Sequence, residues 1–158
     1  MLSIGQVLAF TAAALSTFLA GYGSAKGVGM AGMTSAGVST EVPEVNSKLS
    51  VLQILPGTQG IYGFLIGVII LVKTNALSGK LVEVSLMQGL MLIAAVLPVA
   101  VVGWLSAIHQ AKVASAGMLM VGQHPDMSGK AIMMTVMVET YAVFSLLISF
   151  LIVNSVMG

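Results

Sequence analysis

The chain has 158 residues, of which 58% are hydrophobic and 7% are charged. A soluble domain carries about a quarter charged residues because its surface faces water, so this composition indicates a protein whose main solvent is lipid. The formal net charge of +1 favours neither nucleic acid nor an acidic substrate as a partner. Because the chain has no cysteine, disulfides, thiol catalysis and thiolate metal sites are excluded.

Residues 4–25, 49–72, 84–111 and 131–158 hold no charged residue except Glu139, and these stretches predict four transmembrane helices. Each is long enough, because roughly 20 apolar residues cross a bilayer core. The predicted spans are about 4–38, 49–72, 84–121 and 130–156. We therefore expect an all-α membrane protein of two helical hairpins, residues 1–78 and 79–158. The start of the chain lacks the basic region of a secretory signal, so we expect the first span to be retained.

The distribution of lysines predicts an orientation. Four of the six lie toward the loops between spans one and two and between spans three and four, namely Lys26, Lys48, Lys112 and Lys130. Lys73 and Lys80 lie in the loop between spans two and three. Because loops rich in lysine tend to remain in the cytoplasm, we expect the first and third loops to be cytoplasmic.

The chain also shows an internal duplication. Ala25-Lys26 corresponds in this interpretation to Ala111-Lys112, and Pro43 and Pro125 lie in polar loops that we expect over residues 41–48 and 123–130. Small residues recur at every fourth position of the first span, at Ala9, Ala13, Thr17, Gly21, Ala25 and Gly29. Small residues allow close helix packing in lipid, either inside one monomer or along the inner wall of a ring.

Glu139 is the candidate functional group. It lies roughly 13 Å along the fourth span from Lys130, near the middle of the bilayer. An ionisable group there costs at least ~2.5–3.5 kcal/mol, so it is functional by default. The alternative is a protonated glutamic acid that only ties two helices together.

Polar side chains on two other spans can join Glu139. Thr58, Gln59 and Tyr62 share one helix face just after Pro56-Gly57, where a missing N–H loosens the helix and frees carbonyl oxygens. We expect this break in the second span alone, while Gln110 lies on the third span. Such oxygen-only ligands favour a hard cation over zinc or copper. One carboxylate balances one positive charge, which favours Na⁺, with Li⁺ as a mimic, or a proton.

Three motifs carry a resemblance to a known family. They are Gly-Ser-Ala-Lys-Gly-Val-Gly at 23–29, Leu-Pro-Gly-Thr-Gln-Gly-Ile-Tyr-Gly at 55–63 and Val-Glu-Thr-Tyr-Ala at 138–142. With these motifs the chain resembles the proteolipid (c or K) subunit of the membrane rotor ring of bacterial V-type, sodium-transporting ATPases. The resemblance implies a ring of identical subunits in the bacterial inner membrane, a stator subunit that bears an arginine, and central-stalk subunits.

The resemblance also implies a ligand set for Na⁺. Its members are the Leu55 backbone carbonyl, Thr58, Gln59, Gln110 and Glu139. Tyr62 is expected to donate a hydrogen bond to Glu139. The position that aligns with Glu139 in the first half falls at or near Gly57, so each subunit is expected to carry one ion. ATP hydrolysis would belong to partner subunits, and this chain would not be an enzyme by itself.

Two alternatives of other classes remain at this point. An independent channel or secondary transporter also uses repeats and midplane sites, but such transporters commonly break helices in both halves. A structural proteolipid that forms junction-like rings would leave Glu139 and Gln110 without a role.

The segment Gly27–Gly32 matches a dinucleotide-binding pattern literally, but it continues an apolar helix and carries no such meaning.

Overall fold

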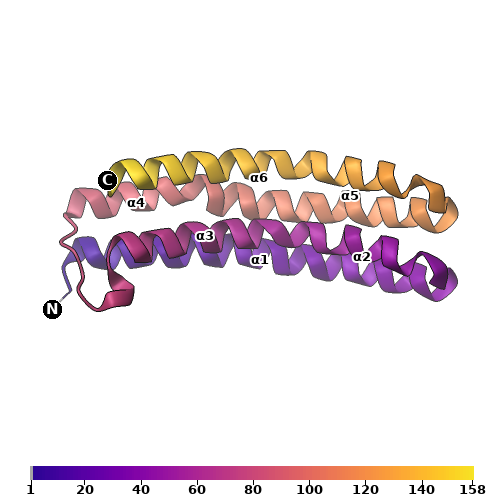
Figure 1. Cartoon of the computed structure of the whole chain (residues 1–158), viewed down its shortest axis with the longest axis horizontal. Coiled ribbons are helices and arrows are strands. Elements are labelled where there is room, and N and C mark those ends of the chain that lie inside the picture. Colours follow the sequence, from indigo (N-terminus) through magenta and orange to yellow (C-terminus); the bar gives the residue numbers. More distant parts are fainter. Residues whose placement is uncertain (1) are drawn as a thin grey trace.

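The computed structural model describes residues 2–158, which form long helices connected by short turns and one extended loop (Figure 1). The helices are α1 (Ile4–Glu41), α2 (Asn46–Ile54), α3 (Thr58–Lys73), α4 (Leu86–Leu97), α5 (Gly103–Gln123) and α6 (Ser128–Val156). Consecutive helices combine into four rods that are long and apolar enough to cross a membrane. They run over Ile4–Glu41, Pro43–Lys73, Leu86–Gln123 and Pro125–Val156. The prediction of an all-α protein with four spans is confirmed.

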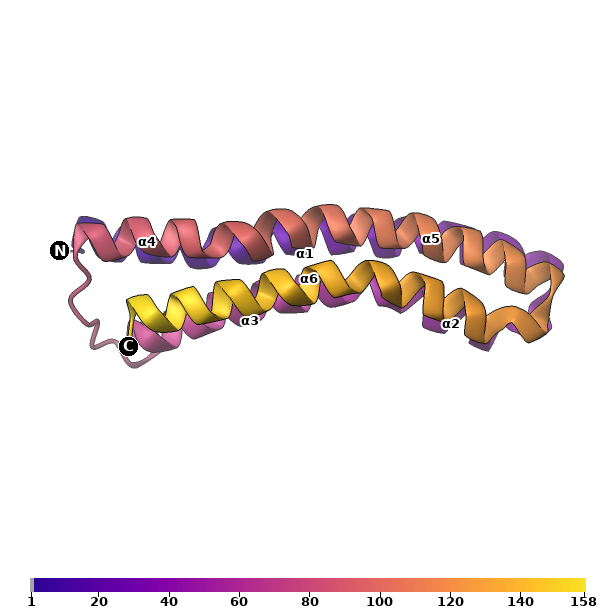
Figure 2. The same cartoon turned by 90° about the horizontal axis from the view of Figure 1, so that it is seen from above.

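The four rods form two layers. Figures 1 and 2 show α1 beside α4 and α5 in one layer, and α2 and α3 beside α6 in the other. Two apolar clusters fill the space between the layers. One includes Ile66 and Leu92, and the other includes Leu49 and Met118. The level of the bundle between these clusters holds the buried polar residues described below.

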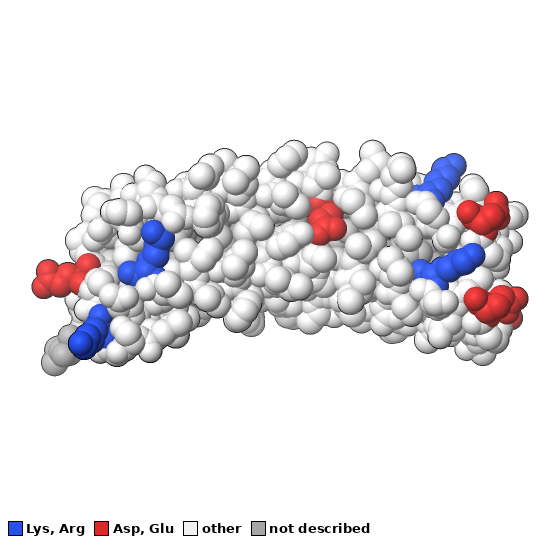
Figure 3. Space-filling view, in the orientation of Figure 1, with Lys and Arg blue, Asp and Glu red and all other residues white. Residues whose placement is uncertain are grey.

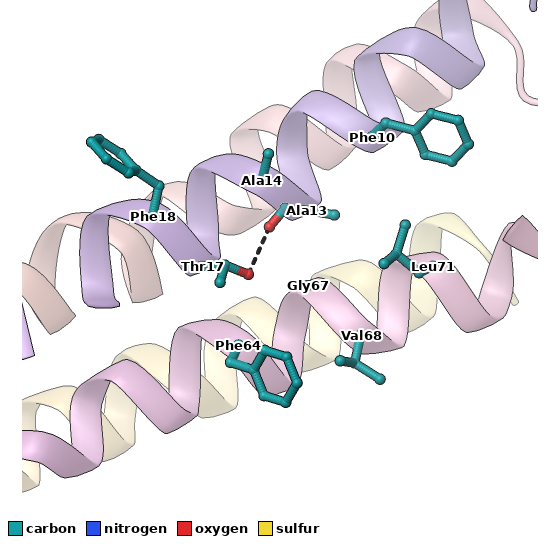
Figure 4. A pocket seen from close by; sticks show the side chains of 9 residues that line it. All are labelled: Phe10, Ala13, Ala14, Thr17, Phe18, Phe64, Gly67, Val68 and Leu71. Atoms are coloured by element: carbon teal, nitrogen blue, oxygen red, sulfur yellow. Dashed lines mark hydrogen bonds between the residues drawn. The ribbon is translucent and has the colours of Figure 1, made fainter. Parts of the chain in front are cut away.

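The rods approach closely where α3 presents glycine to α1. A Cβ atom at Gly67 would lie 2.6 Å from Thr17 Oγ1 and 2.9 Å from the Ala13 carbonyl oxygen. Figure 4 shows these residues on facing helices, with the 3.0 Å hydrogen bond that the Thr17 hydroxyl donates to that carbonyl. Any larger residue at this position would push the helices apart, so the small side chains allow the tight packing expected in lipid.

The stripe of small residues does not keep to one face of α1. Ala9 and Ala13 are buried in the core, whereas Ala25 and Gly29 are exposed. Because a helix has 3.6 residues per turn, a spacing of four drifts by about 40° at each step. The stripe therefore packs inside the monomer at its beginning and faces outward at its end.

The two hairpins repeat each other in helix length and capping. The first and third rods have 38 residues each, and both begin with a capping box, formed by Ser3 with Gln6 and by Ser85 with Gln88. In a capping box two backbone N–H groups at the helix start are satisfied by side chains. The same device at both helix starts supports a duplication.

The register of the duplication differs from the one predicted. When Ile4 is matched to Leu86, Pro43 falls on Pro125 and Lys26 falls on Ile108. The predicted match of Lys26 with Lys112 is therefore wrong by one helical turn, because a recurring Ala-Lys pair is too short to fix a register. The predicted polar loops are also mostly helical, since 3₁₀ turns at Pro43–Val45 and Pro125–Met127 lead directly into α2 and α6.

Each hairpin breaks one of its two rods. In the first hairpin a 3₁₀ turn at Leu55–Gly57 separates α2 from α3. In the second a π-helical turn at Pro98–Val102 separates α4 from α5, and the Val99 N–H donates to Ser149 Oγ of α6 over 3.1 Å. The prediction that only the second span is broken is wrong. Pro98 lacks an N–H and widens the local turn, which frees neighbouring backbone groups for other partners.

Candidate ion-binding site

Glu139 lies far from either end of its helix. By helix rise it is roughly 16 Å from Ser128 and roughly 25 Å from Val156. Its side chain is 9% exposed. Figure 3 shows acidic atoms midway along one face of the molecule, while the other charged groups on that face gather at the two ends. A carboxylate so placed in an apolar span requires partners within the protein.

Two other helices supply partners for the Glu139 carboxylate. The Tyr62 hydroxyl of α3 donates to Glu139 Oε1 over 2.6 Å. The Gln110 amide nitrogen of α5 lies 3.4 Å from Glu139 Oε2 and donates to the Thr135 carbonyl oxygen over 3.1 Å. The first contact is short and strong, and the contact of 3.4 Å is weak. Side chains from two helices, α3 and α5, therefore converge on Glu139 of α6.

Gln59 extends this network and leaves one oxygen free. Its amide nitrogen donates to Gln110 Oε1 over 2.6 Å, and both glutamine side chains are fully buried. Among the residues described, Gln59 Oε1 is a buried oxygen without a hydrogen-bond partner. A buried acceptor without a partner costs about 1–3 kcal/mol, and a cation would satisfy it.

The break between α2 and α3 places two more oxygens together. The Thr58 hydroxyl donates to the Leu55 carbonyl oxygen over 3.0 Å. In donating one proton the hydroxyl keeps lone pairs that can bind a cation. Pro56, in the same turn, has no N–H to donate into the preceding helix, which is the loosening that the sequence predicted.

The predicted site residues thus fall into two hydrogen-bonded groups. One joins Gln59, Tyr62, Gln110 and Glu139, and the other joins Leu55 and Thr58. Thr58 and Gln59 are neighbours in the first turn of α3, so the backbone of this turn connects the two groups.

The Thr135 backbone carbonyl is a further contact of the candidate site, because it accepts a hydrogen bond from the Gln110 amide. The sequence carries no signal for such a contact, since every residue has a backbone carbonyl. His109 lies apart from the site. It is exposed on α5 and lines a groove with Val138 and Tyr141.

The chemistry of the site suits a small monovalent cation or a proton. Among residues 2–158 no three His, Cys, Asp or Glu side chains gather as they would around a transition metal. The available donors are one carboxylate, amide and backbone carbonyl oxygens and a hydroxyl, which hard cations prefer. A single carboxylate can neutralise only one positive charge.

Four apolar spans in two repeated hairpins, with one buried carboxylate held between them, define the class of small membrane proteolipids. The chain matches the ATP synthase C-subunit family over residues 11–70 and again over residues 93–152. It belongs to this family, and the double match agrees with the duplication of the hairpin.

Two relatives extend over nearly the whole chain. V-type sodium ATPase subunit K of Enterococcus hirae is 43% identical over 149 residues, which cover 94% of this chain and 92% of the relative. A-type ATP synthase subunit K of Methanocaldococcus jannaschii is 37% identical over 151 residues, which cover 95% of this chain and 63% of the relative. The resemblance predicted from the three motifs is confirmed.

The family establishes the general role. The chain is a membrane subunit of the rotor ring of a V- or A-type ATPase, and its homologues are rotor subunits rather than catalytic ones. The family forms oligomeric rings within an ATPase, which agrees with the predicted ring of identical subunits. Family membership therefore favours the rotor over the channel and over the junction-like proteolipid.

Proposed function

We propose that the chain binds and carries Na⁺ at Glu139, and that ATP hydrolysis by partner subunits drives this transport. The proposed ligands are the Leu55 carbonyl oxygen, Thr58, Gln59, Gln110 and Glu139. The relative from Enterococcus hirae is a subunit of a sodium ATPase, which supports sodium as the transported ion.

The observation that carries this proposal is the surplus of oxygen around one carboxylate. Gln59 Oε1 is buried without a partner, and Thr58 and Leu55 add oxygens from the neighbouring turn. A proton on Glu139 would need none of these groups. Since the Gln110 nitrogen faces Glu139, cation binding requires this amide to turn over and present its oxygen.

Charge balance selects a monovalent ion. Na⁺ with one carboxylate forms a neutral pair, which can travel through lipid on a rotating ring without a large desolvation cost. A divalent ion would leave one uncompensated charge in the same place. Li⁺ has the same charge and similar ligand preference, so it should mimic Na⁺.

In the proposed cycle the ring carries its ions past a membrane stator subunit. An arginine of the stator attracts the Glu139 carboxylate and releases Na⁺ into a half-channel, and a new ion enters from a second one. Central-stalk subunits couple the turning ring to ATP hydrolysis. We place the protein in the bacterial inner membrane, with the loops between α1 and α2 and between α5 and α6 in the cytoplasm, because most lysines lie toward them.

Carbodiimide labelling of isolated rings tests the site. A hydrophobic carbodiimide should modify Glu139, which is buried in an apolar span, in preference to the four exposed acids of the loops and helix ends. Na⁺ should slow the reaction, Li⁺ should slow it less, and K⁺ at equal ionic strength should have no effect. Glu139→Gln is the control and should remain unlabelled. Labelling that is unaffected by Na⁺ at every pH would contradict the sodium proposal.

A proton-carrying ring is the second candidate, and one observation favours it. The Tyr62 hydroxyl oxygen lies 2.6 Å from Glu139 Oε1 and can accept a hydrogen bond as well as donate one, so this contact also suits a neutral, protonated Glu139. In that case rising pH alone would slow the labelling, and added Na⁺ would not change the rate.

A further inference from the structure

The first turn of α3 holds two proposed ligands, Thr58 and Gln59, but it has no cap of its own. Its N-cap residue is Gly57, which has no side chain, and no side chain of the local sequence caps the helix. The first of its N–H groups, that of Thr58, donates to the Leu55 carbonyl oxygen of the preceding 3₁₀ turn, and the remaining N–H groups of the first turn have no acceptor within α3 itself. An N-cap Ser, Thr, Asp or Asn usually accepts one of them, from the second or third residue.

A serine from another helix supplies the missing acceptor. Gly60 is the third residue of α3, and its N–H donates to Ser24 Oγ of α1 over 2.7 Å. Ser24 is 6% exposed. Water cannot replace this acceptor within a bilayer, where a free N–H costs more than it does at a protein surface. Ser24 therefore does for α3 what an N-cap side chain does in an ordinary helix.

The position of Gly60 bears directly on the site. Gln59 is its neighbour, and the 2.6 Å bond from Gln59 to Gln110 depends on where the first turn of α3 lies. We propose that Ser24 is a positioning residue for the ion site: by capping α3 from α1, it holds the Thr58 and Gln59 oxygens in place for Na⁺. This inference rests on the sodium site proposed above.

Ser16 provides a matched control. It is also a buried serine of α1, and its hydroxyl donates to the Gly63 carbonyl oxygen of α3 over 3.0 Å. Ser16 thus ties the same two helices together one turn further along α3. The Ser16 hydroxyl accepts no backbone N–H from α3. Ser16→Ala therefore removes a hydrogen bond between α1 and α3 without removing a helix cap.

The experiment compares purified rings of the wild type with Ser24→Ala, Ser24→Cys and Ser16→Ala. Radioactive sodium binding at neutral pH should weaken about tenfold in Ser24→Ala, the loss expected for one buried hydrogen bond. Ser24→Cys should lie between, because sulfur is a weak acceptor. Ser16→Ala should stay within about twofold of wild type. Carbodiimide labelling of Glu139 without sodium should be the same in all rings. The Tyr62 hydroxyl that contacts Glu139 lies further along α3 than the turn that Ser24 caps, so these variants should leave that contact in place.

Each other outcome decides against the proposal. Sodium affinity in Ser24→Ala within about twofold of wild type would overturn it, and so would an equal loss in Ser16→Ala. If neither Ser24 variant formed rings, Ser24 would have a global structural role rather than a positioning one. Wild-type rings that bound no sodium would instead overturn the proposed function, and this inference with it.

Discussion

At the depth of the candidate site the first hairpin holds Gly57 where the second holds Glu139, and it holds Val28 where the second holds Gln110. These pairs follow from the register that matches Ile4 to Leu86. The first hairpin therefore lacks both the charge and the amide that contacts it. The comparison shows that one subunit of four spans has one carboxylate site, although its helices are duplicated.

The helix breaks show what the first hairpin contributes instead. It interrupts its second rod at Leu55–Gly57 and offers oxygens from the loosened turn, whereas α6 runs unbroken through Glu139. Ser24 and Ser106 occupy matched positions but act differently. Ser24 accepts the Gly60 N–H at the start of a helix, while Ser106 donates to the Val138 carbonyl oxygen within a continuous helix. The first hairpin thus offers only neutral groups, whereas the second holds the charge and the Gln110 amide beside it.

The largest loss of sodium transport is expected when the buried carboxylate of the second hairpin is replaced by a neutral group, since the first hairpin has no such carboxylate. Glu139→Gln should reduce ATP-driven sodium uptake by vesicles that contain the whole complex to background. Glutamine keeps the shape of the side chain but cannot neutralise a cation. The ring should still assemble. Glu83→Gln, at an exposed acid before α4, should transport normally. Continued sodium uptake by Glu139→Gln would show that another group carries the ion.

The four spans and most residues of the candidate site could be predicted from the sequence. Charge-free stretches predicted the spans because lipid excludes charge, and Glu139 stood out for the same reason. Polar groups in lipid need partners within the protein, so the sequence also predicted that Gln59, Tyr62 and Gln110 lie at the same site as Glu139. These predictions depend on composition and helix spacing, which a sequence displays directly.

Contacts between side chain and backbone could not be predicted in the same way. Ser24 and Ser149 look like small packing residues, and only the fold brings them to the free N–H groups of Gly60 and Val99. The π-helical turn at Pro98–Val102 could not be predicted either, because a proline in a membrane helix does not reveal whether the helix widens or which partners the freed backbone groups find.

A smaller loss is expected when the second hairpin loses its amide. Gln110→Leu makes this position apolar, like Val28, and should weaken sodium binding roughly ten- to a hundredfold. Proton binding should weaken far less, because it needs no amide oxygen. Sodium binding to solubilised rings across pH measures both. Gln53→Leu, which alters the same residue type on α2 where it faces Gly32, should bind sodium normally. Affinity within about twofold of wild type would remove Gln110 from the ligand set.

The next smaller effect on sodium binding is expected at Tyr62 of the first hairpin, compared with Tyr141 of the second. Tyr62→Phe removes the 2.6 Å hydrogen bond to Glu139 and should weaken sodium binding by about tenfold or less. Tyr141→Phe is the matched control, because its side chain is 66% exposed and makes no hydrogen bond to Glu139. Sodium protection against carbodiimide labelling measures both variants. Equal effects in the two would mean that the Tyr62 hydroxyl does not hold the carboxylate.

The smallest effect on ion binding is expected at the helix break of the second hairpin. Ser149→Ala leaves the Val99 N–H without its buried acceptor and should destabilise the subunit by about 1 kcal/mol. Sodium affinity should remain at the wild-type value, because Ser149 lies roughly 15 Å along α6 from Glu139. The thermal unfolding of detergent-solubilised rings measures the first quantity, and sodium binding measures the second. Ser24→Ala is the informative partner in this test, since it removes the same kind of contact beside the site. If Ser149→Ala weakened sodium binding as much as Ser24→Ala did, both breaks would act on the site through the whole bundle, and the division of roles between the hairpins would be wrong.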